Sequence, residues 1–285
     1  MQKKPSILNI IVIIIGLIVF VYGLTQKSES TVLADEINEA VVEAQVDKLE
    51  PKNDGKLVIV SGDIFASDTL TDEYFKVSHK TIKLKRVVEM YQWTQDCSTE
   101  CVYLKVWSEP VINSSKFDDA HKNPDTKQYS SEEYFQKKTY LGEYRLSDKL
   151  VNDLHYDTIM GPDEMLENYG NSSNYSVVGE YITNSANIDN ANIGDFRIHY
   201  EYVKDKAVTV IAKQSGDSFE PFYTEKKREI YDIIEGQQSA ADYVASMKKN
   251  NSLFGIILVV VGLLFIVFGA GAIIFDVLKE RKQQK

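Results

Sequence analysis

The chain has 285 residues, with 32 Lys and Arg against 42 Asp and Glu, and a formal net charge of −10. Residues 25–252 hold all of these charged side chains except six basic and two acidic ones, so this middle segment carries about −14. Such a segment repels the phosphate backbone of nucleic acids, which excludes DNA and RNA as expected partners. We interpret the acidity as a source of solubility rather than as a cation site.

Two apolar segments, 7–24 and 253–275, are predicted to be transmembrane helices. The second has 23 residues and no charge, and as a helix it would extend about 35 Å, enough to cross a hydrocarbon core of about 30 Å. The first resembles a secretory signal, but its 18 residues exceed the usual apolar length of about 7 to 15, and no A-x-A-like site follows Gly23. We therefore expect an anchor at each end of the chain.

Small residues recur every seventh position in both segments, so each set forms a stripe down one helix face. The two stripes are Asn9, Gly16 and Gly23, and Gly255, Gly262 and Gly269. In an antiparallel pair Gly23 is level with Gly255, Gly16 with Gly262, and Asn9 with Gly269. This spacing favours close helix packing, with the Asn9 amide donating to a carbonyl beside Gly269. The alternative is that glycine is simply common in membrane spans.

Basic residues beside the two segments predict their orientation, because Lys and Arg favour the cytoplasmic side. Six lie towards the chain ends and three lie towards the middle segment. The six are Lys3, Lys4, Lys279, Arg281, Lys282 and Lys285, and the three are Lys27, Lys248 and Lys249. Residues 1–6 and 276–285 are therefore expected in the cytoplasm, and 25–252 across the membrane.

The middle segment is predicted to begin with an amphipathic helix over 28–49, followed by a β-rich core over 56–235. Short turns separate the strands, which favours an α+β fold with a mainly antiparallel sheet. Helix starts are predicted at Ser130 with Glu133, at Ser147, at Gly161–Pro162 and at Ser239. A polar loop is expected over 168–174. The expected strands are 56–60, 81–93, 102–107, 140–146, 175–182, 196–202 and 207–213.

Cys97 and Cys101 lie in the short segment CSTEC between two of these strands. Outside the cytosol a disulfide that closes the hairpin tip is favoured over two free thiols. A metal half-site is disfavoured because the four histidines are scattered along the chain. The loop at 187–195 lacks the glycine and the closing glutamate of a calcium loop. We therefore predict no metal and no cofactor.

No common catalytic motif is present in the sequence: there is no G-x-S-x-G, H-E-x-x-H, P-loop or dinucleotide fingerprint. Carboxylates that meet only in the folded protein leave hydrolysis open as an alternative. His121, beside Asp118 and Asp119, is expected to form a hydrogen bond within its own loop. We therefore predict no catalytic residues.

Several phrases along the middle segment together resemble the transmembrane protein 43 family, also called LUMA. They are NDGKLV (53–58) with Ser61–Gly62, KLKRVVEMYQW (83–93), WSE (107–109), INS (112–114), Phe117–Asp118, HKNP (121–124), GDFRI (194–198), VTVIAKQ (208–214), Gly216–Asp217 and Pro221–Phe222. The resemblance implies a non-enzymatic, self-associating integral membrane protein with a lumenal domain. Animal members are placed in the endoplasmic reticulum and inner nuclear membrane, where they organise emerin and lamins.

This chain differs from animal members, which carry several spans after the domain. The difference favours a bacterial inner-membrane protein with a periplasmic domain, with the endoplasmic reticulum or inner nuclear membrane as the alternative. The resemblance supports a scaffold whose partners are the bilayer, further copies of itself, and membrane or envelope proteins. A membrane-tethered ligand sensor and, less favoured, a hydrolase are the alternatives.

Overall fold

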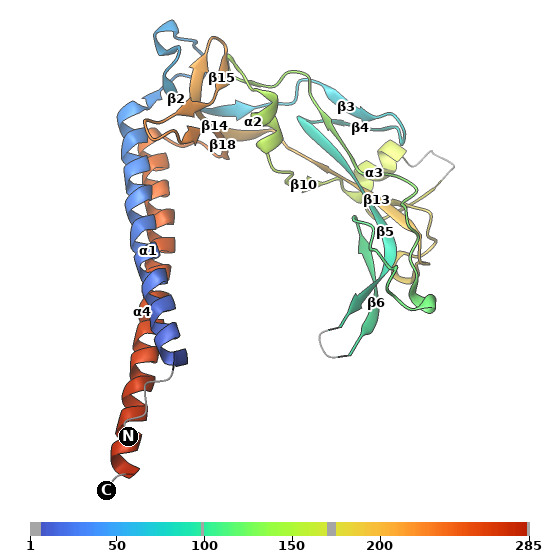
Figure 1. Ribbon diagram of the computed structural model, residues 1–285. Helices are drawn as coiled ribbons and strands as arrows, with labels where there is room; N and C mark the ends of the chain where they lie inside the picture. The colour runs from blue at the N-terminus through green and yellow to red at the C-terminus, as the bar shows by residue number, and fades with distance from the viewer. Residues whose placement is uncertain (1–6, 98–99, 170–174, 284–285) are drawn as a thin grey trace.

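Two long helices stand beside a β domain in the computed structural model, which describes residues 7–97, 100–169 and 175–283. Helices α1 (Ile7–Ala40) and α4 (Ala240–Gln283) pack side by side and run in opposite directions. We call them the helix pair. The β domain (residues 41–239) lies at one end of the helix pair, and both chain ends lie at the other (Figure 1). The expected N-terminus at 1–6, residues 170–174 of the expected loop, and residues 284–285 lie outside the described residues.

The helix predicted over 28–49 is shorter than expected and is not a separate element. Helix α1 continues from the apolar segment without a break and ends at Ala40 rather than at Leu49. The next residues form β1 (Val42–Glu43), which pairs in parallel with β2 (Leu57–Ile64). Ala44 extends this contact by donating its N–H to the Ile59 carbonyl. Pairing with a distant strand therefore overrides the local helical pattern.

The first sheet joins seven strands in the order β1–β2–β8–β9–β15–β14–β18, and β2 also pairs with β14, so part of the sheet closes on itself. Its interior is an apolar core that includes Val58, Val60, Leu141, Val210 and Phe219. Besides β1 and β2, its strands are β8 (Tyr140–Leu141), β9 (Tyr144–Arg145), β14 (Lys206–Ser215), β15 (Ser218–Glu220) and β18 (Asp232–Glu235).

The second sheet is built around the long strand β5 (Lys83–Asp96), which pairs with β13 on one side and with β6 and β7 on the other. Its core includes Leu84, Val88, Ile198 and Tyr200. The other strands are β6 (Val102–Ser108), β7 (Glu132–Phe135), β10 (Thr158–Ile159), β11 (Ser176–Val178), β12 (Tyr181–Thr183) and β13 (Phe196–Tyr202).

Two small hairpins, two short α-helices and three 3-10 helices (Pro51–Asn53, Asp119–His121 and Ile188–Asn190) complete the described part of the β domain. The hairpins are β3 (Thr69–Asp72) with β4 (Val77–Lys80), and β16 (Phe222–Tyr223) with β17 (Glu229–Ile230). Ser147 begins α2 (Asp148–Asp153) by accepting the Leu150 N–H, and α3 (Pro162–Tyr169) begins at the predicted proline. The helix predicted from Ser130 and Glu133 is wrong, because residues 132–135 form strand β7 against β5.

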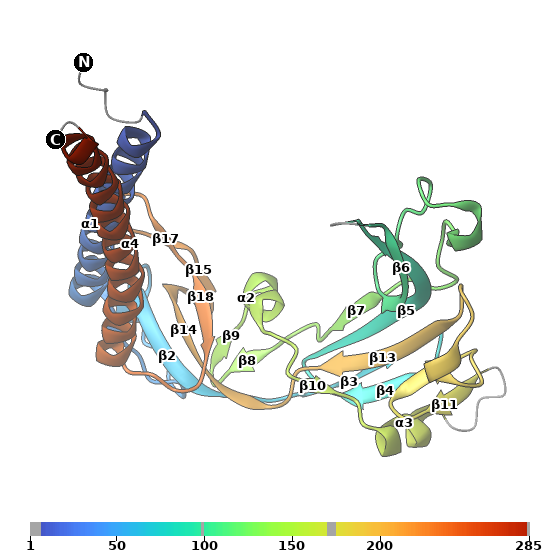
Figure 2. The same ribbon diagram turned by 90° about the horizontal axis from the view of Figure 1, so that it is seen from below.

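The β domain extends sideways from the top of the helix pair, and the hairpin of β5 and β6 turns back in the direction in which the apolar helices run (Figure 1). Seen from below, the two sheets follow one curve that starts at the helix pair and ends at this hairpin (Figure 2). The predicted α+β fold with mainly antiparallel strands and an apolar helix at each end is confirmed.

Candidate functional site

Helices α1 and α4 approach each other most closely at glycines, because no side chain separates the two backbones there. A Cβ atom on Gly16 would lie 2.9 Å from the carbonyl oxygen of Gly262. One on Gly23 would lie 2.8 Å from the backbone nitrogen of Val259 and 3.0 Å from the carbonyl oxygen of Gly255. Separations below 3.0 Å are essentially never seen for real Cβ atoms. At both levels, therefore, only glycine permits this helix separation.

The third predicted contact of the helix pair brings Gly269 close to the backbone of Asn9. A Cβ atom on Gly269 would lie 3.0 Å from the Asn9 carbonyl oxygen and 2.6 Å from a carbon of the Ile13 side chain. The expected hydrogen bond from the Asn9 amide across the seam is not found among the described residues. The three levels lie opposite one another in the order that the seven-residue spacing predicts.

Away from this seam the helix pair exposes apolar side chains. Segments Ile7–Thr25 and Phe254–Phe275 are long and apolar enough to cross a membrane, and most of each is not covered by protein. The exposed side chains include Ile14, Ile18, Leu264, Val267 and Phe268. An outward apolar surface of this length fits a lipid environment. Lipid tails are themselves apolar, so burying these side chains against protein gains no hydrophobic free energy there.

Beyond the apolar segments, towards the β domain, α1 and α4 pack against the first sheet. Ala34 and Ile37 of α1 and Tyr243 and Val244 of α4 are buried in one cluster with side chains of the first sheet. The first sheet contributes Leu57 and Ile59 from β2 and Ile211 from β14, and the β16–β17 hairpin contributes Ile230. The alternation of side chains along β2 explains this, since Val58 and Val60 point into the core of the first sheet and their neighbours face the helices.

Polar contacts fix the same junction. The Ser239 hydroxyl accepts the Asp242 N–H, as the predicted capping box requires, and the Glu43 carboxylate accepts the Ala240 N–H at 2.7 Å. An anionic side chain at the start of α4 also complements the helix dipole. Lys248 forms an ion pair with Asp35 at 2.7 Å and ties the two helices together.

A cavity of about 380 Å³ lies beside this junction. It is lined by residues 43–47, by Ile59 and Ser61 of β2, and by Gln238 and Ser239 before α4. The Ser61 hydroxyl contacts Thr209 and the Gln238 carbonyl, and a side-chain oxygen of Gln238 is buried without a hydrogen bond. The cavity has polar groups that could orient a small ligand.

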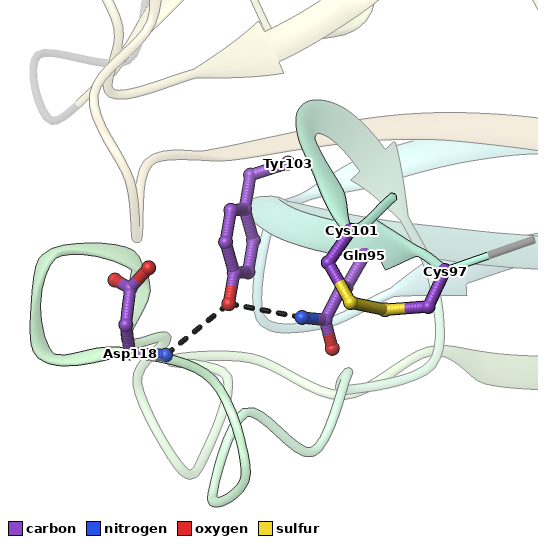
Figure 3. The surroundings of a disulfide bond; sticks show 5 residues. All are labelled: Gln95, Cys97, Cys101, Tyr103 and Asp118. Atoms are coloured by element: carbon purple, nitrogen blue, oxygen red, sulfur yellow. Dashed lines mark hydrogen bonds between the residues drawn. A yellow bond between two sulfur atoms is a disulfide. The ribbon is translucent and has the colours of Figure 1, made fainter. Parts of the chain in front are cut away.

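The hairpin of β5 and β6 carries the disulfide at its end. Cys97 and Cys101 are joined, and the adjacent Tyr103 hydroxyl accepts hydrogen bonds from the Gln95 amide and the Asp118 N–H (Figure 3). His121 stacks on Tyr103, and its Nδ1 forms a hydrogen bond with the Asp118 carboxylate at 2.6 Å. His121 therefore serves its own loop, as the sequence predicts.

A buried ionic network, which the sequence did not reveal, joins the β3–β4 hairpin to the second sheet. Asp72 is fully buried and accepts hydrogen bonds from Arg86 and from the Tyr200 hydroxyl. Arg86 also pairs with Glu132 at 2.9 Å. Burial alone would raise the pKa of Asp72, but the hydrogen bonds from Tyr200 and Arg86 outweigh it and hold that pKa below its usual value. Each charge is satisfied, so the network is structural.

Lys83 is a second buried cation. Its side chain alternates along the chain with those of Ile82 and Leu84, as in a strand that exposes one face, yet it is only 3% exposed. Its ammonium donates to the carbonyls of Asn152 and Leu154 at the end of α2. A cation at this position satisfies carbonyls that a helix end leaves free.

The described residues contain no group of three or more His, Cys, Asp or Glu that could hold a metal ion. The buried charges Asp72, Arg86 and Lys83 are all engaged in hydrogen bonds with protein groups. The described part of the chain therefore supplies an anchor, a fixed junction and a projecting hairpin.

A family model described as transmembrane protein 43 matches residues 84–280. This chain belongs to the transmembrane protein 43 family. Transmembrane protein 43 of mouse and that of human are each 26% identical to it over 249 residues, which cover 79% of this chain and 62% of the relative. The homologue of Drosophila melanogaster is 22% identical over 192 residues, or 61% of this chain and 50% of the relative. No solved structure matches.

The transmembrane protein 43 family match extends from β5 through most of α4. The two apolar helices and the family membership together indicate an integral membrane protein. The chain spans about 62% of the length of the mammalian relatives it matches.

Proposed function

We propose that this protein is a non-enzymatic scaffold that associates with itself in the membrane and recruits other membrane or envelope proteins. The observation that supports this proposal is the shared core between the helix pair and the first sheet, in which Ile37 and Tyr243 are buried against Ile59. Because packed cores are rigid, the β domain keeps one orientation relative to the bilayer. A fixed orientation lets many copies present the same surface in the same direction.

The helix pair also constrains the topology. Both helices run from the β domain to the same far end, so both chain ends lie on one side of a membrane that they cross (Figure 1). The excess of Lys and Arg near the ends supports a cytoplasmic position for them. The β domain would then lie in the bacterial periplasm or, as the alternative, in the lumen of the endoplasmic reticulum and nuclear envelope. Both compartments permit the Cys97–Cys101 disulfide.

Self-association is tested with the full chain in lipid nanodiscs or mild detergent. Chemical cross-linking and light scattering are expected to show a defined oligomer. A matched variant replaces 7–24 with an equally long leucine segment, which keeps the anchor but removes Gly16 and Gly23 from the seam. We expect this variant to lose the oligomer because α1 and α4 no longer pack closely at Gly16 and Gly23, so the spans do not present one fixed surface to a second copy. A monomer at every concentration of the unaltered chain would reject the scaffold.

The topology is tested by protease treatment of sealed vesicles. Cleavage within residues 41–239 is expected only when protease reaches the side away from the chain ends. Cleavage from the cytoplasmic side, or recovery of the full chain in the soluble fraction, would contradict the proposed orientation.

A second candidate function, a membrane-tethered ligand sensor, is favoured by the cavity beside the start of α4. A small ligand there would contact Ser61 of β2 and Gln238 before α4. Thermal-shift screening of the full chain, repeated with Ser61→Phe to fill the cavity, tests this candidate. A ligand that stabilises the unaltered chain and not the variant would favour the sensor over the scaffold.

A further inference from the structure

A pocket of about 250 Å³ lies on the first sheet, where β8 pairs with the end of β2 (Figure 2). It shares no lining residue with the cavity beside the start of α4. Side chains alternate along an extended chain, so Asp63 and Phe65 lie on the face opposite the buried Ile64. The pocket therefore opens to solvent and not into the core. Its lining residues are Asp63, Phe65, Ser67, Lys138, Tyr140 and Gly142.

Two aromatic side chains line this pocket without touching each other. Ile64 pairs with Leu141 in antiparallel strands, which places the next residues, Phe65 and Tyr140, opposite each other on one face. Aromatic side chains in such positions usually pack together. Here no ring contact joins them in the described structure, and they are 63% and 44% exposed. The two rings therefore form part of the pocket wall instead of closing the pocket.

Charged groups lie at the two ends of the pocket. Because the strands are antiparallel, Asp63 lies on one side of the aromatic pair and Lys138 on the other. Both are exposed, and neither forms a hydrogen bond or ion pair with another described residue. A carboxylate accepts hydrogen bonds and an ammonium group donates them. The pocket thus offers an acceptor at one end and a donor at the other, and no protein partner competes for them.

The charge and the size of the pocket restrict its ligand. One carboxylate and one ammonium group sum to zero, so a ligand with a net charge would be attracted by one end and repelled by the other. The volume is below about 300 Å³, the lower end of the usual range for pockets that hold drug-sized ligands, so a single ring fits better. A free amino acid carries both charges on one carbon and cannot reach both Asp63 and Lys138.

We propose that this pocket binds one neutral sugar ring between Phe65 and Tyr140. A pyranose has an apolar face of C–H groups, which packs on aromatic rings, and hydroxyl groups around its edge that both donate and accept hydrogen bonds. Asp63 accepts from a hydroxyl at one end, and Lys138 donates to a hydroxyl at the other. This site goes beyond the scaffold, since it gives the β domain a ligand of its own.

The test is saturation-transfer NMR on the full chain in lipid nanodiscs. The probes are the methyl glycosides of glucose, galactose, mannose and N-acetylglucosamine, together with the trisaccharide of each. At least one methyl glycoside is expected to receive saturation, strongest at the C–H protons of one ring face. A trisaccharide that binds as tightly as its methyl glycoside would identify the end of a glycan chain as the ligand. A methyl glycoside that binds alone would identify a free sugar.

Phe65→Ala and Tyr140→Ala are each expected to reduce the transfer several-fold. The matched control is Tyr223→Ala, because Tyr223 is also an exposed aromatic residue of the β domain, at 58%, but does not line the pocket. Equal transfer in Phe65→Ala and Tyr223→Ala would overturn the proposal, as would the absence of transfer to every glycoside in the panel. Choline and indole are tested alongside. Transfer to either of these and to no glycoside would assign the pocket to a cation or to an aromatic ligand instead.

A second pair of variants keeps the proposal testable if an aromatic variant does not fold. Lys138→Met removes the donor, and Lys137→Met is the matched control, because Lys137 is the adjacent exposed lysine and does not line this pocket. The dissociation constant of the bound glycoside should rise several-fold in Lys138→Met only, and equal constants in the two variants would count against the site. Glycoside binding is measured separately from the oligomer, so the scaffold and the sugar site can fail independently.

Discussion

Gly262 and Gly16 lie so close that a Cβ atom on Gly262 would sit 2.7 Å from the carbonyl oxygen of Gly16. The same atom would be 2.6 Å from the backbone nitrogen of Phe20. Both obstacles are backbone atoms, which cannot rotate out of the way. The two helices therefore contact each other through their main chains at this level.

Gly262→Ala is expected to push the helices apart and lower the free energy of unfolding by about 1–3 kcal/mol, the usual cost of overpacking. Gly262→Leu should cost more. Thermal unfolding of the full chain in detergent measures the change. Gly271→Ala is the matched control on α4, because nothing lies within 4 Å of its Cβ position. Equal midpoints for Gly262→Ala and Gly271→Ala would mean that the helices do not pack at this seam in solution.

Gly142 is expected to tolerate no side chain. Its φ is +57°, and a Cβ atom there would lie 2.0 Å from the Val46 carbonyl oxygen. Gly179→Ala is a control with the same backbone strain, since its φ is +60° and nothing lies within 4 Å. We expect the control to lose about 1–2 kcal/mol and Gly142→Ala to lose about 1–3 kcal/mol more. Chemical denaturation measures both, and equal losses would show that the segment around Val46 is not docked on this turn.

Arg86→Met is expected to destabilise the protein by about 3–5 kcal/mol, because it leaves the Asp72 carboxylate buried without its cation. The control is Glu73→Gln, which removes an ion pair with Lys76 whose glutamate side chain is 81% exposed. That change should stay within about 0.5 kcal/mol. Urea titration of the two variants is the measurement. A loss for Arg86→Met no larger than that of the control would mean that Asp72 reaches water.

The pKa of Asp72, held below its usual value, predicts how stability depends on pH. The ionised carboxylate stabilises the fold above the pKa of an unfolded aspartate, about 3.9. This contribution is lost as the pH falls below that value and through the folded pKa. The difference in urea midpoint between the unaltered chain and Asp72→Asn should therefore be smaller near pH 3 than at pH 6. A difference that is constant across this range would contradict the assignment.

The disulfide is expected to contribute little to global stability. A link between Cys97 and Cys101 closes a very short loop, so a Cys97→Ser, Cys101→Ser variant should lose at most about 2 kcal/mol. The backbone pairing of β5 with β6, from Met90 with Ser108 to Asp96 with Val102, does not depend on the disulfide and should remain in this variant. Thermal unfolding measures the loss, and thiol titration without reductant should find no free thiol in the unaltered chain. Loss of the folded β domain in this variant would show that the hairpin depends on the link.

Elements with a strong local pattern could be predicted from the sequence. Strand β13 has the predicted bounds, because apolar and polar residues alternate along it and it is buried on one face. The capping signals at Ser147, Pro162 and Ser239 each mark a helix start. In all these cases the deciding interactions lie within a few residues in the chain.

The features that could not be predicted depend on partners that are distant in the sequence. Ser130 with Glu133 predicted a helix start, but the hydroxyl of the neighbouring Ser131 accepts the Val88 N–H, and the chain after it pairs with β5. The burial of Lys83 had no signal in the sequence, because its partner is the end of α2, some seventy residues away. Asp72 and Arg86 gave no signal, since an ion pair between two strands has no fixed spacing.

Part of the candidate site, the glycine contact of the helix pair, could be predicted from the sequence, and the placement of the β5–β6 hairpin could not. The seven-residue spacing of Gly16 and Gly262 anticipated which residues face each other, because helix geometry fixes depth from residue number. The position of the β5–β6 hairpin relative to the helix pair could not be predicted. It depends on the curvature of two sheets, which arises from many small twists between strands.

Helices α1 and α4 pass from the apolar segments into the β domain without interruption. No break therefore separates the apolar segments from the core that the helix pair shares with the first sheet. A change in the inclination of the helix pair would turn the first sheet by the same angle, because a packed core does not deform continuously.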